Sequence, residues 1–279
     1  MITYTATLDV DDELTHYLSR LLAAERRRRL TPRGRRALTP FKQAVLGLRW
    51  FLDRTPIPKL ARDNNIGRAT GYRYIDEVID VLADQAPDLH EALEDAAGQG
   101  AAYVMVDGKL FSTDRLGETT ENKNGILIDR WFSGKHHTQG GNVLMITDPT
   151  GFPLWTSPVE PGSVHDSTSA QEHVLGALYW AYSELDLPTL GDGGFQGSGI
   201  GVFTPIKHSK SAPKGCPLDI DNKTYNALLR GLRALCERGF ALLTQRWRTL
   251  QHITASPRKI TTIVQAALTL TRHEHGKIH

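Results

Sequence analysis

The sequence has few cysteines, no long apolar run and almost no net charge. Its 279 residues include two cysteines, Cys216 and Cys236, which form neither a disulfide framework nor a Cys-x-x-Cys metal clip. No apolar run approaches the ~18 residues that cross a bilayer, and the first residues lack the basic-then-apolar order of a signal peptide. We therefore expect a cytoplasmic protein with no membrane contact, in which the cysteines are packing residues.

The net charge is close to zero, but basic residues are concentrated in one part of the chain. Lys and Arg number 33 against 31 Asp and Glu, a formal net charge of +2, which by itself predicts no nucleic-acid partner. Arginines nevertheless crowd one stretch near the N-terminus, namely Arg20, Arg26, Arg27, Arg28, Arg29, Arg33, Arg35 and Arg36. Such a run indicates either a basic surface for nucleic acid or a solvated charged helix.

Residues 39–82 have the periodicity of three helices. Thr39-Pro40 is typical of a helix start, an N-cap followed by proline at the first helical position. A short second helix, a turn at residues 64–67 and a third helix from Arg68 complete the order of a helix-turn-helix, with an ordinary three-helix bundle as the alternative. The last helix of a helix-turn-helix presents its N-terminal residues to the major groove. The candidate DNA-binding residues are therefore Arg68, Thr70, Tyr72 and Arg73.

The pattern changes at Gly98-Gln99-Gly100, which ends an acidic helical segment. Beyond it come short β-rich runs at residues 102–106, 142–147 and 152–159, and helical stretches at 167–185 and 222–250. This order predicts an α/β fold in which helices flank a mixed sheet. We expect two domains, an all-α helix-turn-helix domain over residues 1–98 and an α/β domain over residues 99–279.

Three acidic residues are candidate catalytic groups. Asp107 follows the apolar run 103–106 and is expected at a strand end, where the sites of open α/β sheets gather, although Asp-Gly is also a common hairpin signal. Asp192 repeats this arrangement, with a glycine-rich turn as the alternative. Glu237 is expected inside a helix, pointing away from its apolar stripe, where most glutamates are solvated surface residues. The stripe consists of Leu228, Leu232, Leu235 and Leu242.

The order of five sequence blocks resembles the DDE transposases of bacterial insertion sequences, in the branch similar to Harbinger-like nucleases. The blocks are Val106-Asp107-Gly108, Ser133-Gly134-Lys135-His136, Pro161-Gly162-Ser163-Val164-His165-Asp166-Ser167, Gly191-Asp192-Gly193-Gly194-Phe195-Gln196-Gly197 and Glu237-Arg238. The third and fourth blocks are distinctive as a pair, and the likeness covers residues 39–250. The family often has Lys after the second Asp and Tyr two positions further on, where this chain has Gly193 and Phe195.

The resemblance implies an RNase H-like catalytic domain in which Asp107, Asp192 and Glu237 bind metal. Mg²⁺ or Mn²⁺ accepts carboxylate oxygens, and two such ions stabilise the attacking and leaving oxygens of a phosphodiester. The implied protein is a nucleoid-associated homodimer that binds double-stranded DNA at transposon ends, cleaves it and joins the cut end to target DNA.

Other charged residues are expected to serve that chemistry. Lys135, Arg230, Arg233 and Arg238 are candidate phosphate contacts, which position DNA without reading its sequence. No Gly-x-Ser-x-Gly nucleophile motif accompanies His165 and Asp166, so we interpret the pair as accessory to the site or structural.

Two other functions compete with transposition. One is a helix-turn-helix regulator whose catalytic domain has decayed, and the other is a metal-dependent nuclease without strand transfer. The presence of all three carboxylates favours an enzyme over the regulator, whereas sequence cannot separate the nuclease from the transposase.

Overall fold

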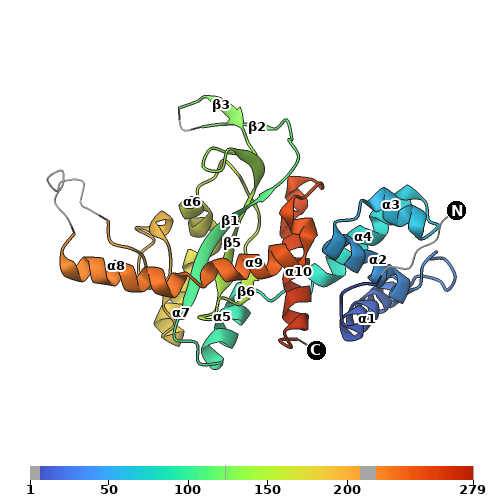
Figure 1. Ribbon diagram of the computed structural model, residues 1–279, viewed down its shortest axis with the longest axis horizontal. Helices are drawn as coiled ribbons and strands as arrows, with labels where there is room; N and C mark the ends of the chain where they lie inside the picture. Colours follow the sequence, from blue (N-terminus) through green and yellow to red (C-terminus); the bar gives the residue numbers. More distant parts are fainter. Residues whose placement is uncertain (1–6, 123, 208–217, 279) are drawn as a thin grey trace. The chain divides into compact units, whose positions relative to one another are not determined.

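The computed structural model describes residues 7–122, 124–207 and 218–278, and the chain divides into two compact units (Figure 1). The helical unit comprises Met1–Ala86, Leu243–Gln251 and Thr262–His279. The sheet unit comprises Pro87–Leu242 and His252–Thr261. None of the helices in the described ranges is both long and apolar enough to cross a membrane.

The helical unit contains the N-terminal helices and the last segments of the chain. Its elements are α1 (Asp12–Arg28), α2 (Pro40–Asp53), α3 (Ile57–Asp63), α4 (Arg68–Ala83), the end of α9 (Cys236–Arg246), the 3₁₀ helix η2 (Arg248–Gln251) and most of α10 (Ile260–Glu274). Thr39 caps α2 by accepting a hydrogen bond from the Lys42 amide at 3.3 Å, with proline in the first turn, which confirms the predicted helix start.

The C-terminal helices complete the core of the helical unit. Trp247 is fully buried, and its Nε1 donates to Thr271 Oγ1 on α10 at 2.8 Å. Thr269 Oγ1 donates to the Leu82 carbonyl at 2.9 Å, which ties α10 to the end of α4. α10 was not predicted from the sequence, and the predicted division at residue 98 therefore differs from the division into two compact units.

Part of the arginine-rich stretch is used inside the helical unit. Glu77 of α4 is 3% exposed, and Arg36 binds it through both terminal nitrogens, at 2.8 and 3.2 Å. Gln43 Nε2 donates to Glu77 at 2.8 Å, and Arg26 Nη2 donates to Gln43 Oε1 at 2.6 Å. Because a buried carboxylate needs such partners, two arginines of the run stabilise the fold.

The sheet unit begins with α5 (Leu89–Gly98), which Asp88 and Glu91 start with a capping box. Its strands are β1 (Val104–Ser112), β2 (Thr119–Glu121), β3 (Leu127–Asp129), β4 (Phe132–Ser133), β5 (Thr138–Thr147), β6 (Pro153–Thr156), β7 (Glu160–Pro161), β8 (Thr189–Leu190) and β9 (Val202–Phe203). Its other helices are α6 (Asp166–His173), α7 (Leu175–Leu185), the 3₁₀ helices η1 (Gly193–Phe195) and η3 (Pro257–Lys259), α8 (Ile220–Arg233) and the start of α9.

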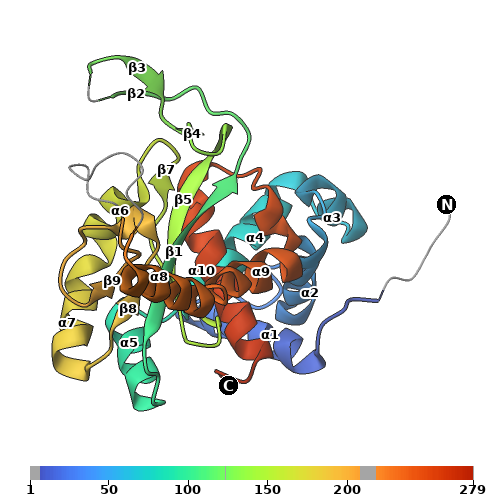
Figure 2. The ribbon, with the colours of Figure 1, turned by 60° about the vertical axis from the view of Figure 1, so that its left-hand side comes forward.

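The main sheet is mixed, in the order β4-β5-β1-β8-β9, with β6 and β7 also paired to β5. β1 is antiparallel to β5 and parallel to β8, and β8 is parallel to β9. The strands β2 and β3 form a separate hairpin that extends away from the main sheet (Figure 2). This arrangement confirms the predicted α/β class with helices flanking a mixed sheet.

Helices cover the two faces of the sheet differently. Val104 and Val106 of β1 belong to a core formed with α5 and α7, whereas Met105 packs with Leu229 of α8 and Cys236 of α9. Figure 1 shows α8 and α9 running in sequence across the strands. Because side chains alternate along a strand, Asp107 lies on the same face as Met105, toward α8.

Two local predictions for the sheet unit were wrong. Asp107 and Gly108 lie in the middle of β1 instead of at a strand end or hairpin, because β1 continues in register with β5 to Ser112. The predicted apolar stripe does not form one buried face, since Leu228 and Leu232 of α8 and Leu235 after it are exposed while Leu229 is buried. The predicted helical stretches 167–185 and 222–250 are mainly helical, with breaks after His173, Arg233 and Arg246.

We expect Arg36→Ala to lower the free energy of unfolding by about 2 kcal/mol, because it removes the bidentate partner of a buried carboxylate. The expected loss is smaller than for a fully buried ion pair, because the Arg36 side chain is 24% exposed and solvent screens its charge. Urea unfolding followed by circular dichroism measures the effect. Arg28→Ala is the matched control, since Arg28 pairs with Glu25 at a side-chain exposure of 73%; an equal loss in both variants would contradict a special role for Arg36.

Candidate active site

Asp107 and Asp192 occupy corresponding positions beside two neighbouring parallel strands. β1 and β8 pair through Met105 and Leu190, and each aspartate lies two residues beyond its member of that pair. Asp107 is within β1, whereas Asp192 follows the end of β8 and caps η1 by accepting from the Gly194 amide at 2.7 Å. The strand register therefore brings together two of the three predicted catalytic carboxylates.

Arg233 at the end of α8 is the cation next to Asp107. Its Nη2 lies 3.7 Å from Asp107 Oδ1, and its side chain is only 17% exposed. From the sequence, Arg233 is predicted to contact DNA phosphate. The structure places it inside the site, where its charge offsets that of the carboxylate.

Burial raises the pKa of Asp107 above its ordinary value, because a charged carboxylate loses hydration there. The Arg233 charge and the Gly108 amide act in the opposite direction, and the negative charges of Asp192 and Asp166 raise the pKa further. Burial, with a contribution from Asp107, also raises the pKa of the Cys236 thiol to about 11. Cys236 is thus a neutral packing residue at neutral pH, as its sequence context predicts.

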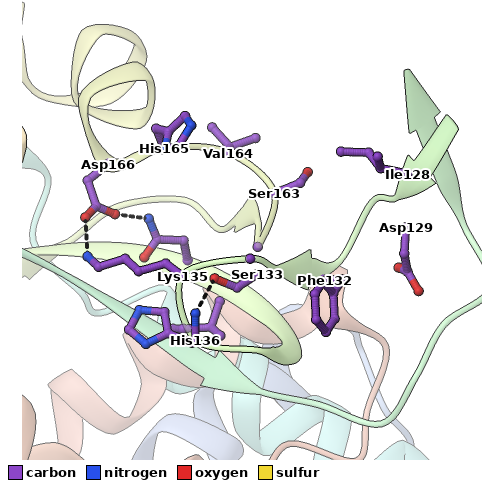
Figure 3. A pocket seen from close by; sticks show the side chains of 14 residues that line it. Ile128, Asp129, Phe132, Ser133, Lys135, His136, Ser163, Val164, His165 and Asp166 are labelled. Atoms are coloured by element: carbon purple, nitrogen blue, oxygen red, sulfur yellow. Dashed lines mark hydrogen bonds and ion pairs between the residues drawn. The ribbon is translucent and has the colours of Figure 1, made fainter. Parts of the chain in front are cut away.

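Asp166, the first residue of α6, is a third carboxylate on this edge of the site. Its Oδ1 accepts from Asn142 Nδ2 of β5 at 2.5 Å, and its Oδ2 lies 3.2 Å from Lys135 Nζ (Figure 3). A Cβ atom at Gly108 would lie 2.9 Å from Asp166 Oδ1. Glycine at position 108 therefore lets this carboxylate approach β1.

Lys135 is paired with Asp166 and lies within range of the charges of Asp107 and Asp192. Burial lowers the pKa of Lys135, but the charge and hydrogen bond of Asp166 and the charges of Asp192 and Asp107 outweigh burial, so its pKa is raised. Together with Arg233, Lys135 balances the negative charge of the site.

Glu237 is exposed in the first turn of α9, next to Cys236. Close packing holds this turn in place. A Cβ at Gly239 would lie 2.7 Å from Thr147 Cγ2 of β5, and Arg238 Nη1 donates to the Thr150 carbonyl at 3.3 Å. Within the described ranges, no group of three His, Cys, Asp or Glu residues is arranged to hold a metal ion, so Glu237 does not complete a cluster with the aspartates in this conformation.

The remaining candidates lie around this site. Arg230 is exposed on α8, and Arg238 is exposed apart from its contact with Thr150. His165 is exposed and precedes α6 as its N-cap residue, without a capping hydrogen bond from its side chain. Of the predicted accessory pair, Asp166 is the member that contacts other site residues.

Comparison with protein families identifies the family of the chain. The family described as DDE superfamily endonuclease matches residues 106–272, which is more than half of the chain. The protein is a DDE superfamily endonuclease. Comparisons with curated proteins and with solved structures found no match.

Membership of the DDE superfamily endonucleases confirms the resemblance to DDE-type transposases and indicates a nuclease-type enzyme acting on DNA. The matched region contains Asp107, Asp166, Asp192 and Glu237 and excludes α1 to α5. The Harbinger-like branch and the origin in a bacterial insertion sequence stay predictions.

Sequence reasoning missed three features of this DDE endonuclease. Asn142 holds Asp166, Gly108 makes room for it, and Arg233 neutralises Asp107. Each depends on contacts between distant segments. The only local signal was an asparagine at the start of an apolar run, which is unusual inside a strand.

We expect Asp107→Asn to stabilise the metal-free protein at neutral pH. The raised pKa means that the folded state keeps the Asp107 proton to a higher pH than the unfolded chain does, so the ionised carboxylate costs stability above the folded-state pKa. The urea midpoint in EDTA should rise at pH 7, and the gain should disappear below the ordinary pKa of aspartate. Glu237→Gln, at an exposed position, should change the midpoint little. A lower midpoint for Asp107→Asn at pH 7 would show that attraction to Arg233 outweighs burial.

Proposed function

We propose that the protein is a DNA transposase that binds the ends of an insertion sequence, hydrolyses phosphodiester bonds there and transfers the cut strand to target DNA. The observation that carries this proposal is the register of β1 and β8, which brings Asp107 and Asp192 together in a DDE superfamily chain. The resemblance of the five sequence blocks supplies the step from nuclease to transposase.

The strand order supports an RNase H-like catalytic fold. A meander of antiparallel strands, β1, β5 and β6, is followed by β8 and β9, which add in parallel on the other side of β1. Helices lie on both faces of this sheet. The first carboxylate is then on the central strand and the second follows the adjacent parallel strand.

The donor set at the site fits hard divalent cations. Asp107 and Asp192 offer carboxylate oxygens, and Mg²⁺ or Mn²⁺ is commonly held by one or two carboxylates with water in the other positions. We propose that these two aspartates and Glu237 hold two ions. When bound, such ions stabilise negative charge on the attacking and leaving oxygens of a phosphodiester.

The cationic side chains of the site suit a polyanionic substrate. Arg233 and Lys135 lie beside Asp107 and Asp166, where they offset carboxylate charge. A DNA phosphate entering the site brings further negative charge, which these two cations would orient and partly neutralise. Arg230 and Arg238 are exposed and would position the backbone farther along the DNA.

The helices α3 and α4 support a helix-turn-helix in the helical unit. A four-residue turn separates them, with Asn65 at φ 52°, and Gly71 allows close packing because a Cβ there would lie 3.1 Å from Ala61 Cβ. The first two turns of α4 are exposed at Arg68, Tyr72 and Arg73. We propose that residues 1–98 bind DNA, residues 99–279 carry the catalysis, and two copies of the chain hold the two transposon ends.

Each substitution of a proposed metal ligand should abolish Mg²⁺-dependent cutting while leaving DNA binding intact. Asp107→Asn, Asp192→Asn and Glu237→Gln keep side-chain size but remove a negative charge from the ion site. We expect a loss of at least about 10³-fold in cleavage, the scale associated with losing electrostatic stabilisation of a transition state. Cleavage of end-containing DNA is compared with binding of the same preparation.

The same assay discriminates between the alternatives. Near-normal cutting by Glu237→Gln together with inactive Asp166→Asn would move the third ligand to Asp166. On a supercoiled plasmid carrying the element's ends, joined products indicate a transposase, and cutting without joining indicates a nuclease. No cutting by the wild type in Mg²⁺ or Mn²⁺ would contradict an active enzyme.

The exposed first two turns of α4 should read the DNA ends. Arg68→Ala and Arg73→Ala should each weaken specific binding, by about 1 to 3 kcal/mol if the residue makes a bidentate base contact. Fluorescence anisotropy with end DNA and scrambled DNA measures affinity and discrimination. Lys59→Ala, at an exposed position of α3, controls for simple loss of charge and should not alter discrimination. Unchanged specificity in both arginine variants would place recognition elsewhere, with the Arg26 to Arg36 segment as the next candidate.

A further inference from the structure

A pocket of ≈ 390 Å³ in the sheet unit has Asp166 of the acidic site in its wall. It is formed by β3, β4 and the turn that follows, by β1 and β5, and by the loop leading into α6. Lys135 and Asp166 line it and also belong to the acidic site. The pocket and the site therefore share one wall.

The walls of the pocket have two chemical characters. Leu110, Ile128, Phe132 and Val164 give apolar surface, Lys135 and Asp166 give charge at the side shared with the acidic site, and Asp129 adds a further carboxylate. Figure 3 shows Val164 and His165 on the loop along one side and Phe132 on the strand opposite. The Phe132 ring is 39% exposed, which is high for an aromatic side chain and leaves part of the ring open to a ligand.

Backbone contacts preform the pocket. The Gly162 amide donates to the Gly140 carbonyl at 3.0 Å, and Ser163 Oγ donates to the Arg130 carbonyl at 2.8 Å. A Cβ at Gly162 would lie 2.7 Å from the carbonyl oxygens of Gly140 and Trp131, so only glycine lets the loop pack this closely on β4 and β5. The loop carrying Val164 is thereby fixed opposite the strand carrying Phe132.

An apolar compartment with an aromatic wall and with Lys135, paired with Asp166, at one end suits a flat heteroaromatic ring joined to a phosphate. A volume of ≈ 390 Å³ lies within the range of small-molecule sites, and a base of a duplex has to leave the stack to enter such a pocket. We propose that this pocket takes one unpaired nucleotide of the DNA strand, with its base against Phe132 and its phosphate against Lys135. The proposal rests on the proposed function, since DNA is the substrate that would deliver such a nucleotide.

A nucleotide bound in the pocket would position the DNA strand relative to the acidic site. A phosphate held at Lys135 would lie next to Asp166, whose carboxylate approaches β1 at Gly108, the residue after Asp107. A base seated in the pocket would therefore fix the strand near the bond to be cut. Pulling one base out of a duplex costs stacking and pairing energy, which contact with the aromatic wall would offset.

The test uses the full chain in EDTA, so that it does not depend on bound metal. The probes are deoxyadenosine 5′-monophosphate and 2-deoxyribose 5-phosphate, which differ only in the base. Saturation-transfer NMR should show magnetisation transfer to the base protons, and titration should show tighter binding of the nucleotide. Phe132→Ala should weaken nucleotide binding by about fivefold or more, the lower end for loss of a stacked base, without changing the affinity for the sugar phosphate.

Two further variants make the test specific. Phe203→Ala is the matched control, because Phe203 is also 39% exposed but does not line the pocket; it should bind the nucleotide like the wild type. Val164→Trp fills the pocket from the opposite wall and should abolish the preference for the nucleotide. Circular dichroism checks that each variant is folded.

Equal affinity of the wild type for both probes, no detectable binding of either, or equal effects of Phe132→Ala and Phe203→Ala would overturn the pocket proposal. These results are separable from failure of the proposed function. Mg²⁺-dependent cutting of DNA with no preference for the nucleotide would reject the pocket alone. A nucleotide preference that requires Phe132, in a protein that cuts no DNA, would support the pocket and reject the transposase.

Discussion

Parallel pairing of β1 with β8 fixes the positions on which the rest of the candidate site depends. Met105 and Leu190 meet in this pairing, and both aspartates follow two residues later. β8 can take this place only because α6 and α7 return the chain to the β1 edge of the sheet, as a parallel connection requires. The crossover through α6 and α7, which cover one face of the sheet, thus places Asp192 beside Asp107.

Collecting carboxylates on one edge creates a charge problem that the fold solves with fixed cations. Arg233 comes from α8 and Lys135 from the turn after β4, so two different elements supply the balancing charge. Asn142 adds a neutral donor to Asp166. Asp107 and Asp166 therefore lie close together, and each has a polar or cationic partner in the fold. Carboxylates gathered in this way can also attract metal cations to the same edge of the sheet.

Local signals predicted some of the fold because they act over a few residues. The Thr39-Pro40 helix start, the α/β class and the approximate strands follow from capping chemistry and periodicity. The same signals failed at Asp107-Gly108, where turn composition lies within a strand because β5 pairs along its whole length. They also failed for α8, whose apolar stripe is exposed while Leu229 packs on the sheet, since periodicity does not say which face has a partner. Of the site, the candidate acids were identified by resemblance, whereas Arg233, Asn142 and Gly108 became visible only through long-range contacts.

The path of the chain between its two units bears on how the protein is made. The polypeptide leaves the helical unit after Ala86 and returns to it at Leu243 and again at Thr262. Trp247 and Thr269, which complete the core around the first helices, are therefore synthesised long after those helices. During translation α1 to α4 emerge well before the residues that cover them, so the helical unit cannot reach its final packing until α10 has left the ribosome. A chain truncated before α10 would leave the first helices permanently without that cover.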